Sequence, residues 1–208
     1  VLEAVKRKGL SGVGIDVSND ISFAVNKNKV DIAFIALHGV YGEDGSIQGL
    51  LEYEKIPYTG PGVLASALAY DKVKSKEILK FNEIPTADYQ VFYREEKEKH
   101  ERKLNFPIVV KPSNQGSSIG VSIVREEKEW IAALELAFRY SKEILVEKFI
   151  EGKLLAVGMN GEQPMPIVHI KPKSAFYDYE AKYTRGKTEY TCPAELSTKE
   201  IECCEDVA

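Results

Sequence analysis

The sequence contains little cysteine and no long apolar run. Only three of its 208 residues are cysteine, with Cys192 alone and Cys203 and Cys204 adjacent. An odd count without a CxxC motif excludes a disulfide scaffold and gives little reason to expect zinc, so we predict free thiols on or near a helix and a cytoplasmic location. Because no apolar run approaches the roughly 18 residues that a membrane helix needs, we predict no membrane span.

The numbers of acidic and basic residues are also nearly balanced. The sequence has 28 Lys and Arg residues against 32 Asp and Glu residues, a formal net charge of −4. This balance argues against a general nucleic-acid-binding surface but allows a local basic pocket for phosphates. A chain that is 44% hydrophobic and 29% charged has the composition of an ordinary folded protein, which excludes disordered and collagen-like classes.

The length is sufficient for one large domain or two small ones. Residues 1–8 have the pattern of the middle of an amphipathic helix. Ser197 and Glu200 form a capping box that predicts the start of a helix. The sequence ends at Ala208, before a glycine or proline that would stop this helix. We therefore expect the chain to be a segment of a longer protein.

The first 70 residues alternate between extended and helical patterns. Residues 12–17 and 32–37 predict strands, the second buried on both faces as in a parallel sheet, and residues 46–53 predict a short helix. Residues 56–62 predict a brief strand that enters a turn. The pattern indicates half of an open parallel sheet, which binds ligands at the carboxyl ends of its strands. His38 follows such an end, where it is either a substrate-binding residue or a buried structural histidine.

From residue 71 the pattern changes to an α+β layer. The sequence predicts a lysine-rich helix over 71–81 and strands over 106–110, 121–124 and 144–149. Between the last two strands, apolar residues at helical spacing predict a buried helix face. That face consists of Trp130, Ile131, Leu134, Ala137 and Phe138.

A hairpin and a charged segment complete this layer. Strands over 154–159 and 166–170 are predicted to pair around Asn160 and Gly161, a type I′ turn signal. The charge run over 94–102, which contains His100, predicts a solvated surface. His169 lies in the middle of a predicted strand, and we interpret it as structural.

The strongest chemical signal is Lys111, which ends a β-rich strand and precedes a loop of small residues over 112–120. Backbone N–H groups of such a loop can cradle an anion, and the ammonium group can act as a point charge on phosphate oxygens. The loop lacks the Walker motif. A flexible hairpin tip is the alternative interpretation.

Two further lysines come from separate elements. Lys72 opens the helix over 71–81, and Lys182 lies in a segment over 174–190 that contains four tyrosines. A loop of this length in a compact domain is often an active-site lid, although an exposed loop without a catalytic role is the alternative. Three lysines that converge on one phosphate chain are the pattern that phosphoryl transfer requires. Glu147, at a strand end, could accept a hydrogen bond from an adenine amino group or be an ordinary polar residue.

Taken in order along the chain, these residues resemble the D-alanine–D-alanine ligases of the ATP-grasp superfamily. The matching motifs are HG at 38–39, GEDG at 42–45, PYTG at 57–60, ASA at 65–67, DK at 71–72, VKPS at 110–113, GSS at 116–118, EK at 147–148, YDYEAKY at 177–183 and CPA at 192–194. The ordered set covers nearly the whole chain and is much more specific than any one of its members.

The resemblance implies a fold of class α/β plus α+β. An amino-terminal parallel open-sheet domain would occupy residues 1–70, and the central ATP-grasp subdomain would occupy residues 71–152. Residues 153–208 would begin the carboxyl-terminal ATP-grasp subdomain, which includes the lid over 174–190. The family's amino-terminal glycine-rich loop would precede Val1.

The resemblance also implies ATP-dependent ligation of two D-alanines through a D-alanyl phosphate, which releases ADP and phosphate and supplies a peptidoglycan precursor. Mg²⁺ or Mn²⁺ would accompany ATP, with ligands beyond Ala208, and the enzyme would form a homodimer without nucleic-acid or membrane partners. A D-alanine–D-lactate ligase of the same fold and a non-catalytic nucleotide-binding module are the alternatives.

Residue by residue, the resemblance assigns roles at both ends of the site. The nucleotide-binding set consists of Lys72, Lys111 and Lys182 for the phosphates, Ser118 in the loop that closes over them, and Glu147, Lys148 and Ile150 for adenine. The substrate-binding set is His38, Ser117 and Tyr183, and the catalytic set is Ser117, Lys182 and Tyr183. Leu154 stands where the family usually has a glutamate for the ribose.

Overall fold

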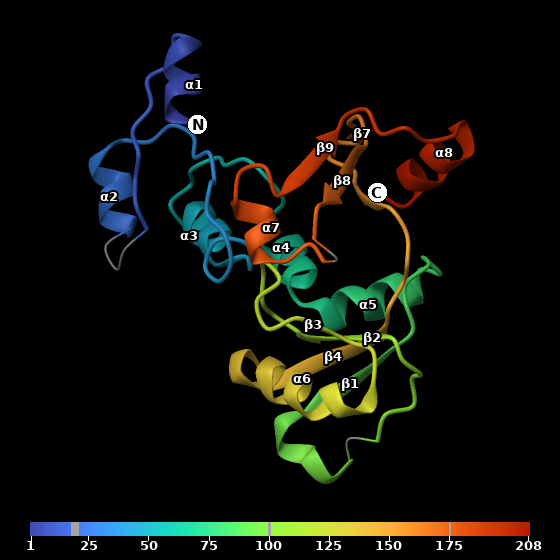
Figure 1. Cartoon of the computed structure of the whole chain (residues 1–208). Coiled ribbons are helices and arrows are strands. Elements are labelled where there is room, and N and C mark those ends of the chain that lie inside the picture. The colour runs from blue at the N-terminus through green and yellow to red at the C-terminus, as the bar shows by residue number, and fades with distance from the viewer. Residues whose placement is uncertain (18–20, 100, 175) are drawn as a thin grey trace. The chain divides into compact units, whose positions relative to one another are not determined.

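The computed structural model describes residues 1–17, 21–99, 101–174 and 176–208. The chain divides into two compact units, Val1–Ala69 and Tyr70–Ala208 (Figure 1). Each unit has a hydrophobic core of its own. The predicted mixed α/β class is confirmed, whereas the assignment of particular segments to family domains stays a prediction.

Helices form most of the regular structure that is described in the first unit. They are α1 (Leu2–Arg7), α2 (Ile21–Lys27), α3 (Ser46–Tyr53) and α4 (Val63–Tyr70), which ends where the units divide. The core of the unit consists of Val25, Ile47, Leu51 and Ile56. The helix predicted over residues 46–53 is confirmed with the same bounds.

The strands predicted in the first unit do not form a ladder. Among its described residues, pairing is confined to one parallel bridge between Ala33 and Tyr58. Ile32 and Phe34 are 63% and 60% exposed, so the run over 32–37 is not buried on both faces. A continuous apolar run predicts that both faces of a strand are buried, but it does not show whether another strand pairs with it.

The second unit centres on a four-stranded antiparallel sheet of order β1-β4-β2-β3. Its strands are β1 (Tyr89–Tyr93), β2 (Ile108–Pro112), β3 (Ser122–Val124) and β4 (Glu143–Lys148). Helix α6 (Glu127–Tyr140) packs against β2, β3 and β4, and α5 (Lys72–Phe81) runs along the other side of the sheet (Figure 1). The β2–β3 hairpin and the two helices were all predicted.

The buried face of α6 differs from the prediction at one position. Trp130, Leu134, Ala137 and Phe138 are buried as predicted, together with Ala133, whereas Ile131 is 61% exposed. At about 100° per residue, position 131 lies at the edge of the stripe, roughly 90° from its centre. The helical period therefore identified the face correctly, but its width was overestimated.

The strand register decides which side chains of the sheet lie together. Alternate residues of β2 and β4 point to opposite faces. One set packs in the core against α6: Ile108, Val110, Ile144 and Val146. The other set faces α5: Val109, Lys111, Leu145 and Glu147. Lys111 and Glu147 therefore project from neighbouring strands on the same face.

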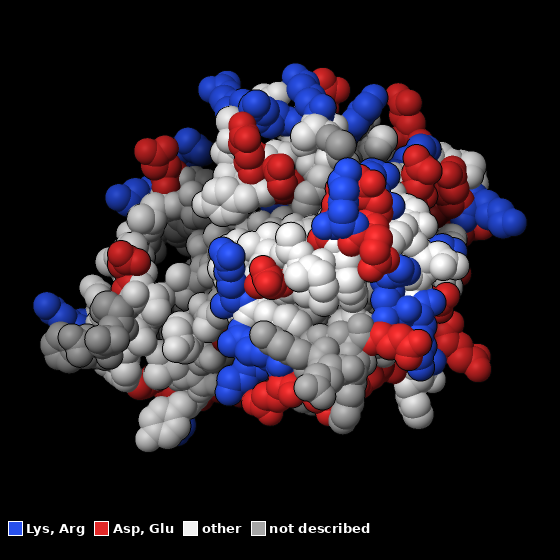
Figure 2. Space-filling model, turned by 60° about the horizontal axis from the view of Figure 1, so that its bottom comes forward, with Lys and Arg blue, Asp and Glu red and all other residues white. Residues whose placement is uncertain are grey.

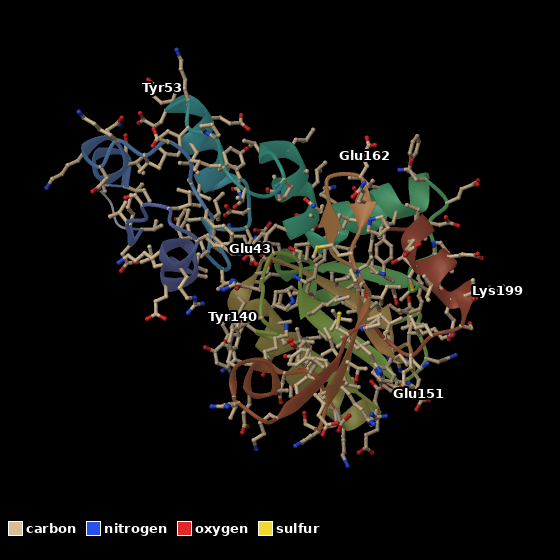
Figure 3. All side chains as sticks on the ribbon, turned by 90° about the horizontal axis from the view of Figure 1, so that it is seen from above. Glu43, Tyr53, Tyr140, Glu151, Glu162 and Lys199 are labelled. Atoms are coloured by element: carbon tan, nitrogen blue, oxygen red, sulfur yellow. The ribbon has the colours of Figure 1, made fainter. Side chains whose placement is uncertain are left out.

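A second, three-stranded sheet has the order β5-β8-β9. Its strands are β5 (Leu154–Ala156), β8 (Val168–Pro172) and β9 (Thr188–Thr191), and a short hairpin of β6 (Met159–Asn160) and β7 (Gln163–Pro164) separates the first two. The predicted hairpin is confirmed, but its tip is Gly161 and Glu162 (Figure 3). Of these two, only Gly161 has a positive φ, so the turn is not type I′, which requires two. His169 lies within β8, as predicted.

The described part of the segment over 174–190 contains more regular structure than the predicted loop. It contains α7 (Tyr179–Tyr183) and the start of β9. Helix α7 begins at Asp178, whose Oδ1 accepts a hydrogen bond from the backbone N–H of Ala181 at 2.8 Å. This N-cap holds one turn of helix that is too short to show a helical period in the sequence. We call residues 174–190 the tyrosine segment below.

Several predictions at the surface and the carboxyl end are confirmed. Helix α8 (Thr198–Asp206) starts with the predicted capping box of Ser197 and Glu200. The three cysteines are free, two within α8 and one directly after β9. Residues 94–96 of the charge run, in the 3₁₀ helix η1 (Arg94–Lys99), are exposed as predicted, and His100 lies outside the described residues. Arg102 differs from the prediction, because its side chain is only 21% exposed and its guanidinium group packs on the ring of Phe106. The face in Figure 2 carries acidic and basic side chains side by side.

No helix within the described ranges is long and apolar enough to cross a bilayer.

Gly120 is the glycine whose replacement we expect to cost most in this unit. Its φ is +72°, and a Cβ would lie 2.7 Å from Cδ2 of Tyr140 and 2.8 Å from Cγ of Pro112. Gly120→Ala should lower the free energy of unfolding by about 2 kcal/mol, because both the backbone conformation and the packing oppose a methyl group. Urea denaturation measures this change. In the control, Gly152→Ala, the methyl group meets nothing within 4 Å, and equal losses would contradict the explanation.

Candidate functional site

The amino-terminal end of α5 is bonded to the loop that follows β2. Asp71 caps the helix by accepting hydrogen bonds from the N–H groups of Val73 and Lys74. The backbone N–H of Lys72 donates to the carbonyl of Ser113 at 2.9 Å. Its ammonium group donates to the carbonyls of Ser113 at 3.3 Å and Gln115 at 2.5 Å. Lys72 is thus fixed where the sheet, the helix and the loop meet.

The ammonium group of Lys72 lies in an unfavourable electrostatic environment. Burial, and next the positive charge of Lys111, lower the pKa of Lys72 from 10.5 to about 8, although Asp71 and Glu147 act in the opposite direction. Lys182 lowers this pKa further. The charges of three lysines from three separate elements therefore interact. A cluster of this kind is suited to a polyanionic ligand such as a phosphate chain.

Glu147 lies between two ammonium groups. Its Oε1 pairs with Nζ of Lys111, and its Oε2 lies 3.0 Å from Nζ of Lys76. The side chains of Glu147 and Lys76 are only 13% and 8% exposed, so these ion pairs are largely shielded from water. Burial of the three charges depends on their mutual compensation, because an unpaired buried charge is strongly destabilising.

Two hydrogen bonds join the loop after β2 to the tyrosine segment. The hydroxyls of Ser117 and Tyr183 lie 2.7 Å apart, and the hydroxyl of Ser118 donates to the carbonyl of Tyr177 at 2.9 Å. Both serines have a left-handed backbone, with φ of +53° and +60°. Left-handed non-glycine residues cost about 1–3 kcal/mol each and occur preferentially at functional sites. The strain therefore marks the same loop that the lysine cluster marks.

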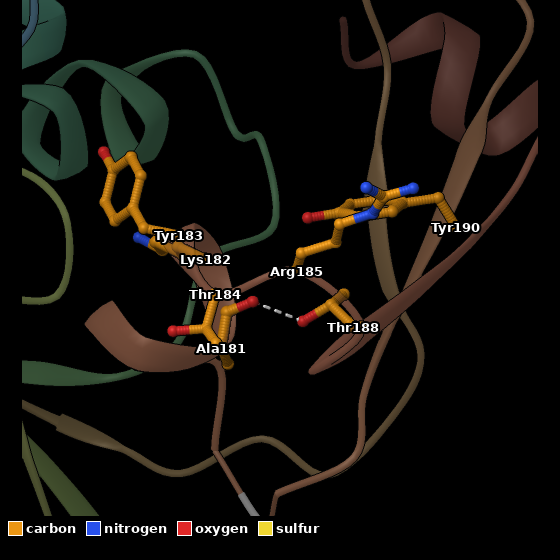
Figure 4. Close-up of a pocket in the computed structure, with 8 residues that line it drawn as sticks. Ala181, Lys182, Tyr183, Thr184, Arg185, Thr188 and Tyr190 are labelled. Carbon is orange, nitrogen blue, oxygen red and sulfur yellow. Dashed lines mark hydrogen bonds between the residues drawn. The ribbon is translucent and has the colours of Figure 1, made fainter.

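The tyrosine segment has internal contacts of its own. The hydroxyl of Tyr177 lies 3.0 Å from that of Tyr190, and this hydrogen bond is the main cause that raises the pKa of Tyr177 to about 12. The ammonium group of Lys182 lies 5.3 Å from the centre of the Tyr177 ring. Thr188 donates a hydrogen bond to the carbonyl of Ala181 at 2.6 Å (Figure 4). Its hydroxyl thereby ties β9 back to α7.

A pocket of about 340 Å³ opens within the tyrosine segment. Residues of α7, of β9 and of the segment between them line it, among them Lys182, Tyr183 and Arg185 (Figure 4). Lys72 and Lys111 do not line it. We therefore base the candidate site on the interacting lysines and not on this pocket.

The remaining predicted residues lie farther out or in the other unit. Lys148 ends β4 and is exposed, with its backbone N–H bonded to the carbonyl of Asp88. Ile150 follows the strand and is 62% exposed. His38 belongs to the first unit, its side chain is 73% exposed and its Nδ1 lies 3.9 Å from Oε1 of Glu43. The alternative interpretation of His38 as a buried structural histidine is therefore wrong.

The described residues do not fit a metal centre. Nowhere in the described ranges do three or more His, Cys, Asp or Glu side chains gather so that they could hold a metal ion. Glu147, the carboxylate that pairs with Lys111, already has an ammonium group on each oxygen.

Lys76 is the member of the site that the sequence did not reveal. It lies one helical turn after Lys72 and three residues after the buried Val73, on the side of α5 that faces the sheet. A lysine at such a position usually extends to solvent, so its type argued against burial. The available signal was its position on the inward-facing stripe of the helix.

Comparison with known proteins identifies the family. The model described as "D-ala D-ala ligase C-terminus" matches residues 78–208, and the model described as "D-ala D-ala ligase N-terminus" matches residues 6–61. The chain belongs to the D-alanine–D-alanine ligase family. Its membership agrees with the order of motifs along the whole sequence.

Individual relatives of the family are similar over nearly the whole chain. A D-alanine–D-alanine ligase from Geotalea uraniireducens is 49% identical over 94% of this chain and 64% of its own length. One from Geobacter sulfurreducens is 48% identical over 94% of this chain and 62% of its own length. The chain therefore spans less than two thirds of the length of these relatives.

Solved structures of the family have the same fold. A D-alanine–D-alanine ligase from Bacillus anthracis aligns with a TM-score of 0.82 at 34% identity, over 99% of this chain and 69% of that one. The complex of that ligase with ATP aligns with a TM-score of 0.80 at 31% identity, over 97% and 65%. The VanG D-Ala:D-Ser ligase from Enterococcus faecalis aligns with a TM-score of 0.69 at 32% identity, over 86% and 54%.

We expect Lys72 to titrate with a midpoint of about 8, so that its positive charge is present below this pH and lost above it. NMR of the lysine ε-methylene groups measures the midpoint, and Lys72→Arg identifies the signal by removing it. Lys111→Met should raise the midpoint, because one repelling charge is gone. A Lys72 signal that remains protonated through about pH 10, near the usual range of lysine, would show that the ammonium group is neither buried nor repelled.

Proposed function

We propose that the whole protein that contains this chain joins two D-alanines to D-alanyl-D-alanine with ATP, through a D-alanyl phosphate, and so supplies a peptidoglycan precursor. The observation that carries the proposal is the position of Lys72, whose ammonium group is bonded to the strained loop that contains Ser117 and Ser118 and is affected by the charges of Lys111 and Lys182. Family membership directs this phosphate-binding chemistry towards a ligase.

In this proposal the lysine cluster binds the phosphates of ATP. Phosphoryl transfer depends mostly on the position of the reactants and on neutralised charge, and three ammonium groups supply both. Lys72 and Lys111 come from the rigid α5 and β2, whereas Lys182 comes from the tyrosine segment. The tyrosine segment therefore supplies the third charge of the cluster.

The adenine end of the nucleotide would lie at the end of β4. The carboxylate of Glu147 is suited to accept a hydrogen bond from the exocyclic amino group, since an ionised carboxylate is an acceptor only. Lys148 and Ile150 supply backbone groups just beyond the strand, where the chain leaves the sheet. The proposed nucleotide thus spans from this strand end to Lys72.

The D-alanines would bind where the loop after β2 meets the tyrosine segment. Ser117 and Tyr183 hold each other by a hydrogen bond, which fixes two hydroxyls towards a substrate. His38 is the third member of the proposed substrate set. Transfer of phosphate to the carboxylate of the first D-alanine creates a good leaving group, which the amine of the second then displaces. The tyrosine segment would exclude water from this hydrolysable intermediate.

The comparisons support ATP as the nucleotide, but they do not distinguish among D-amino and D-hydroxy acids as the second substrate. The Bacillus anthracis relative was solved with ATP, which favours ATP here. The VanG relative is a D-Ala:D-Ser ligase at 32% identity, close to the 34% of the D-alanine–D-alanine ligase structure. D-serine is therefore a third candidate acceptor, beside D-alanine and D-lactate. The proposal also includes Mg²⁺ or Mn²⁺, a homodimer and a cytoplasmic location, which rest on the family resemblance alone.

The test is ATP-dependent phosphate release by the whole protein when D-alanine is added. We expect release in the wild-type protein, and we expect Lys111→Ala to raise the KM for ATP and lower kcat, each by about tenfold or more, because one charge on the phosphates is lost. Lys128→Ala, which removes a lysine that is 75% exposed on α6, is the control and should change neither constant.

Two outcomes would contradict the proposal. If Lys111→Ala leaves both constants unchanged, Lys111 has no part in the site. If the wild-type protein binds ATP but releases no phosphate with any D-amino or D-hydroxy acid, a nucleotide-binding module explains the fold better than a ligase.

Tyr183→Phe tests the acceptor end of the site. It removes the hydroxyl that lies 2.7 Å from the hydroxyl of Ser117 but keeps the ring. We expect the preference for D-alanine over D-lactate, measured as a ratio of kcat/KM values, to fall by about tenfold because Ser117 is no longer fixed. Tyr179→Phe is the control, since Tyr179 stacks on Tyr183 at 4.7 Å in the same helix. An unaltered preference in Tyr183→Phe would remove Tyr183 from the acceptor site.

A further inference from the structure

All three N–H donors of the Lys76 ammonium group have partners within the protein. It donates hydrogen bonds to the hydroxyl of Thr86 and the carbonyl of Ala87, both at 2.8 Å, and it pairs with Oε2 of Glu147 at 3.0 Å. An ammonium group has three N–H donors, so these three partners occupy all of them. Lys76 is 7% exposed. It has neither a donor nor the access to bind a substrate itself.

Glu147 has a different partner on each oxygen, and the two partners differ in kind. Lys111, on Oε1, has a side chain that is 20% exposed and belongs to the proposed phosphate cluster. A nucleotide would therefore compete with Glu147 for this ammonium group. Lys76, on Oε2, is also bonded to Thr86 and Ala87, so its position does not depend on the position of Lys111.

The surroundings hold Lys76 in one position. Tyr89 of β1 is directly opposite Glu147 of β4 in the sheet, and the Tyr89 ring lies 5.1 Å from Nζ of Lys76. The ammonium group is thus enclosed by the sheet, by this ring and by the segment between α5 and β1 that contains Thr86 and Ala87. Such a site orients a carboxylate more firmly than a solvated lysine would.

We propose that Lys76 is a positioning residue that holds Glu147 so that its Oε1 faces the adenine amino group. The inference rests on the proposed function, in which Glu147 recognises adenine. A carboxylate in this orientation favours a purine with an amino group at position 6, because that group can donate a hydrogen bond to it. It repels a purine with an oxygen at position 6, because the carboxylate oxygen and the purine oxygen are both acceptors. Lys76 would therefore contribute to the preference for ATP over ITP.

The first test is Lys76→Met, which removes the charge and keeps an unbranched side chain against Tyr89. We expect the KM for ATP to rise by about tenfold with kcat within about twofold of the wild type, and the preference for ATP over ITP to fall by a similar factor. Lys80→Met is the matched control, because Lys80 lies one turn farther along α5, is exposed, and also has its ammonium group near the Tyr89 ring, at 4.4 Å. It should change neither constant.

The second test asks whether Lys76 acts through Glu147. In a Glu147→Gln background, Lys76→Met should add little to the KM for ATP, since its partner is already neutral. Full additivity of the two changes, or equal effects on ATP and ITP, would show a general structural role and overturn the inference. If Lys76→Met does not fold, Thr86→Val removes one of the three partners and should raise the KM for ATP in the same direction. An unchanged KM in a folded Thr86→Val protein would also overturn the inference.

Binding measurements keep this inference separate from the proposed function. The affinities of ATP and ITP are measured with the same proteins in the absence of D-alanine. Absence of D-alanine-dependent phosphate release overturns the ligase proposal, while a loss of ATP preference in Lys76→Met would still support the positioning role. An active wild-type protein with an unchanged ATP preference in Lys76→Met overturns the positioning role alone.

Discussion

The compensation of three buried or half-buried charges on one face of a β-sheet is the constraint on which the candidate site depends. Glu147 is held between Lys76 of α5 and Lys111 of β2. This arrangement anchors the helix to the sheet and determines where Lys111 lies. Lys72, one turn earlier on the same helix, is then placed at the loop after β2. A shift of one residue in the register of β2 or β4 would turn Lys111 or Glu147 into the core against α6.

The site combines rigid and strained parts, and each has a separate physical role. The sheet and α5 hold Lys72, Lys111 and Glu147 on regular elements, which places charges precisely. The left-handed serines and the tyrosine segment meet them through two side-chain hydrogen bonds. These bonds involve few buried groups, so this part of the site is the easier one to open and close. In the proposed function, the rigid part binds the phosphate chain and the tyrosine segment excludes water from the reaction.

Predictions from the sequence succeeded where a local pattern is sufficient. The helix of residues 46–53, the apolar stripe of α6 and the capping box at Ser197 follow from period and cap chemistry alone. They failed where the outcome depends on a distant neighbour, on the width of an apolar stripe or on a single cap. The run over 32–37 pairs only at Ala33, and Ile131 lies at the edge of its stripe in the solvent. Helix α7 was missed because a single turn that depends on the Asp178 cap shows no period.

The sequence by itself determined the family and the chemical character of the site, because motif order and residue type are local properties. It placed Lys72, Lys111 and Lys182 on three different elements and identified the tyrosine segment. Only the tertiary structure decided that their charges interact, that Glu147 bridges two lysines and that Lys76 is buried. The reason is physical: the partner of a charged side chain is set by strand register and helix packing, and these arise between residues far apart in the chain. Lys76 and Glu147 come together only when α5 lies on the sheet.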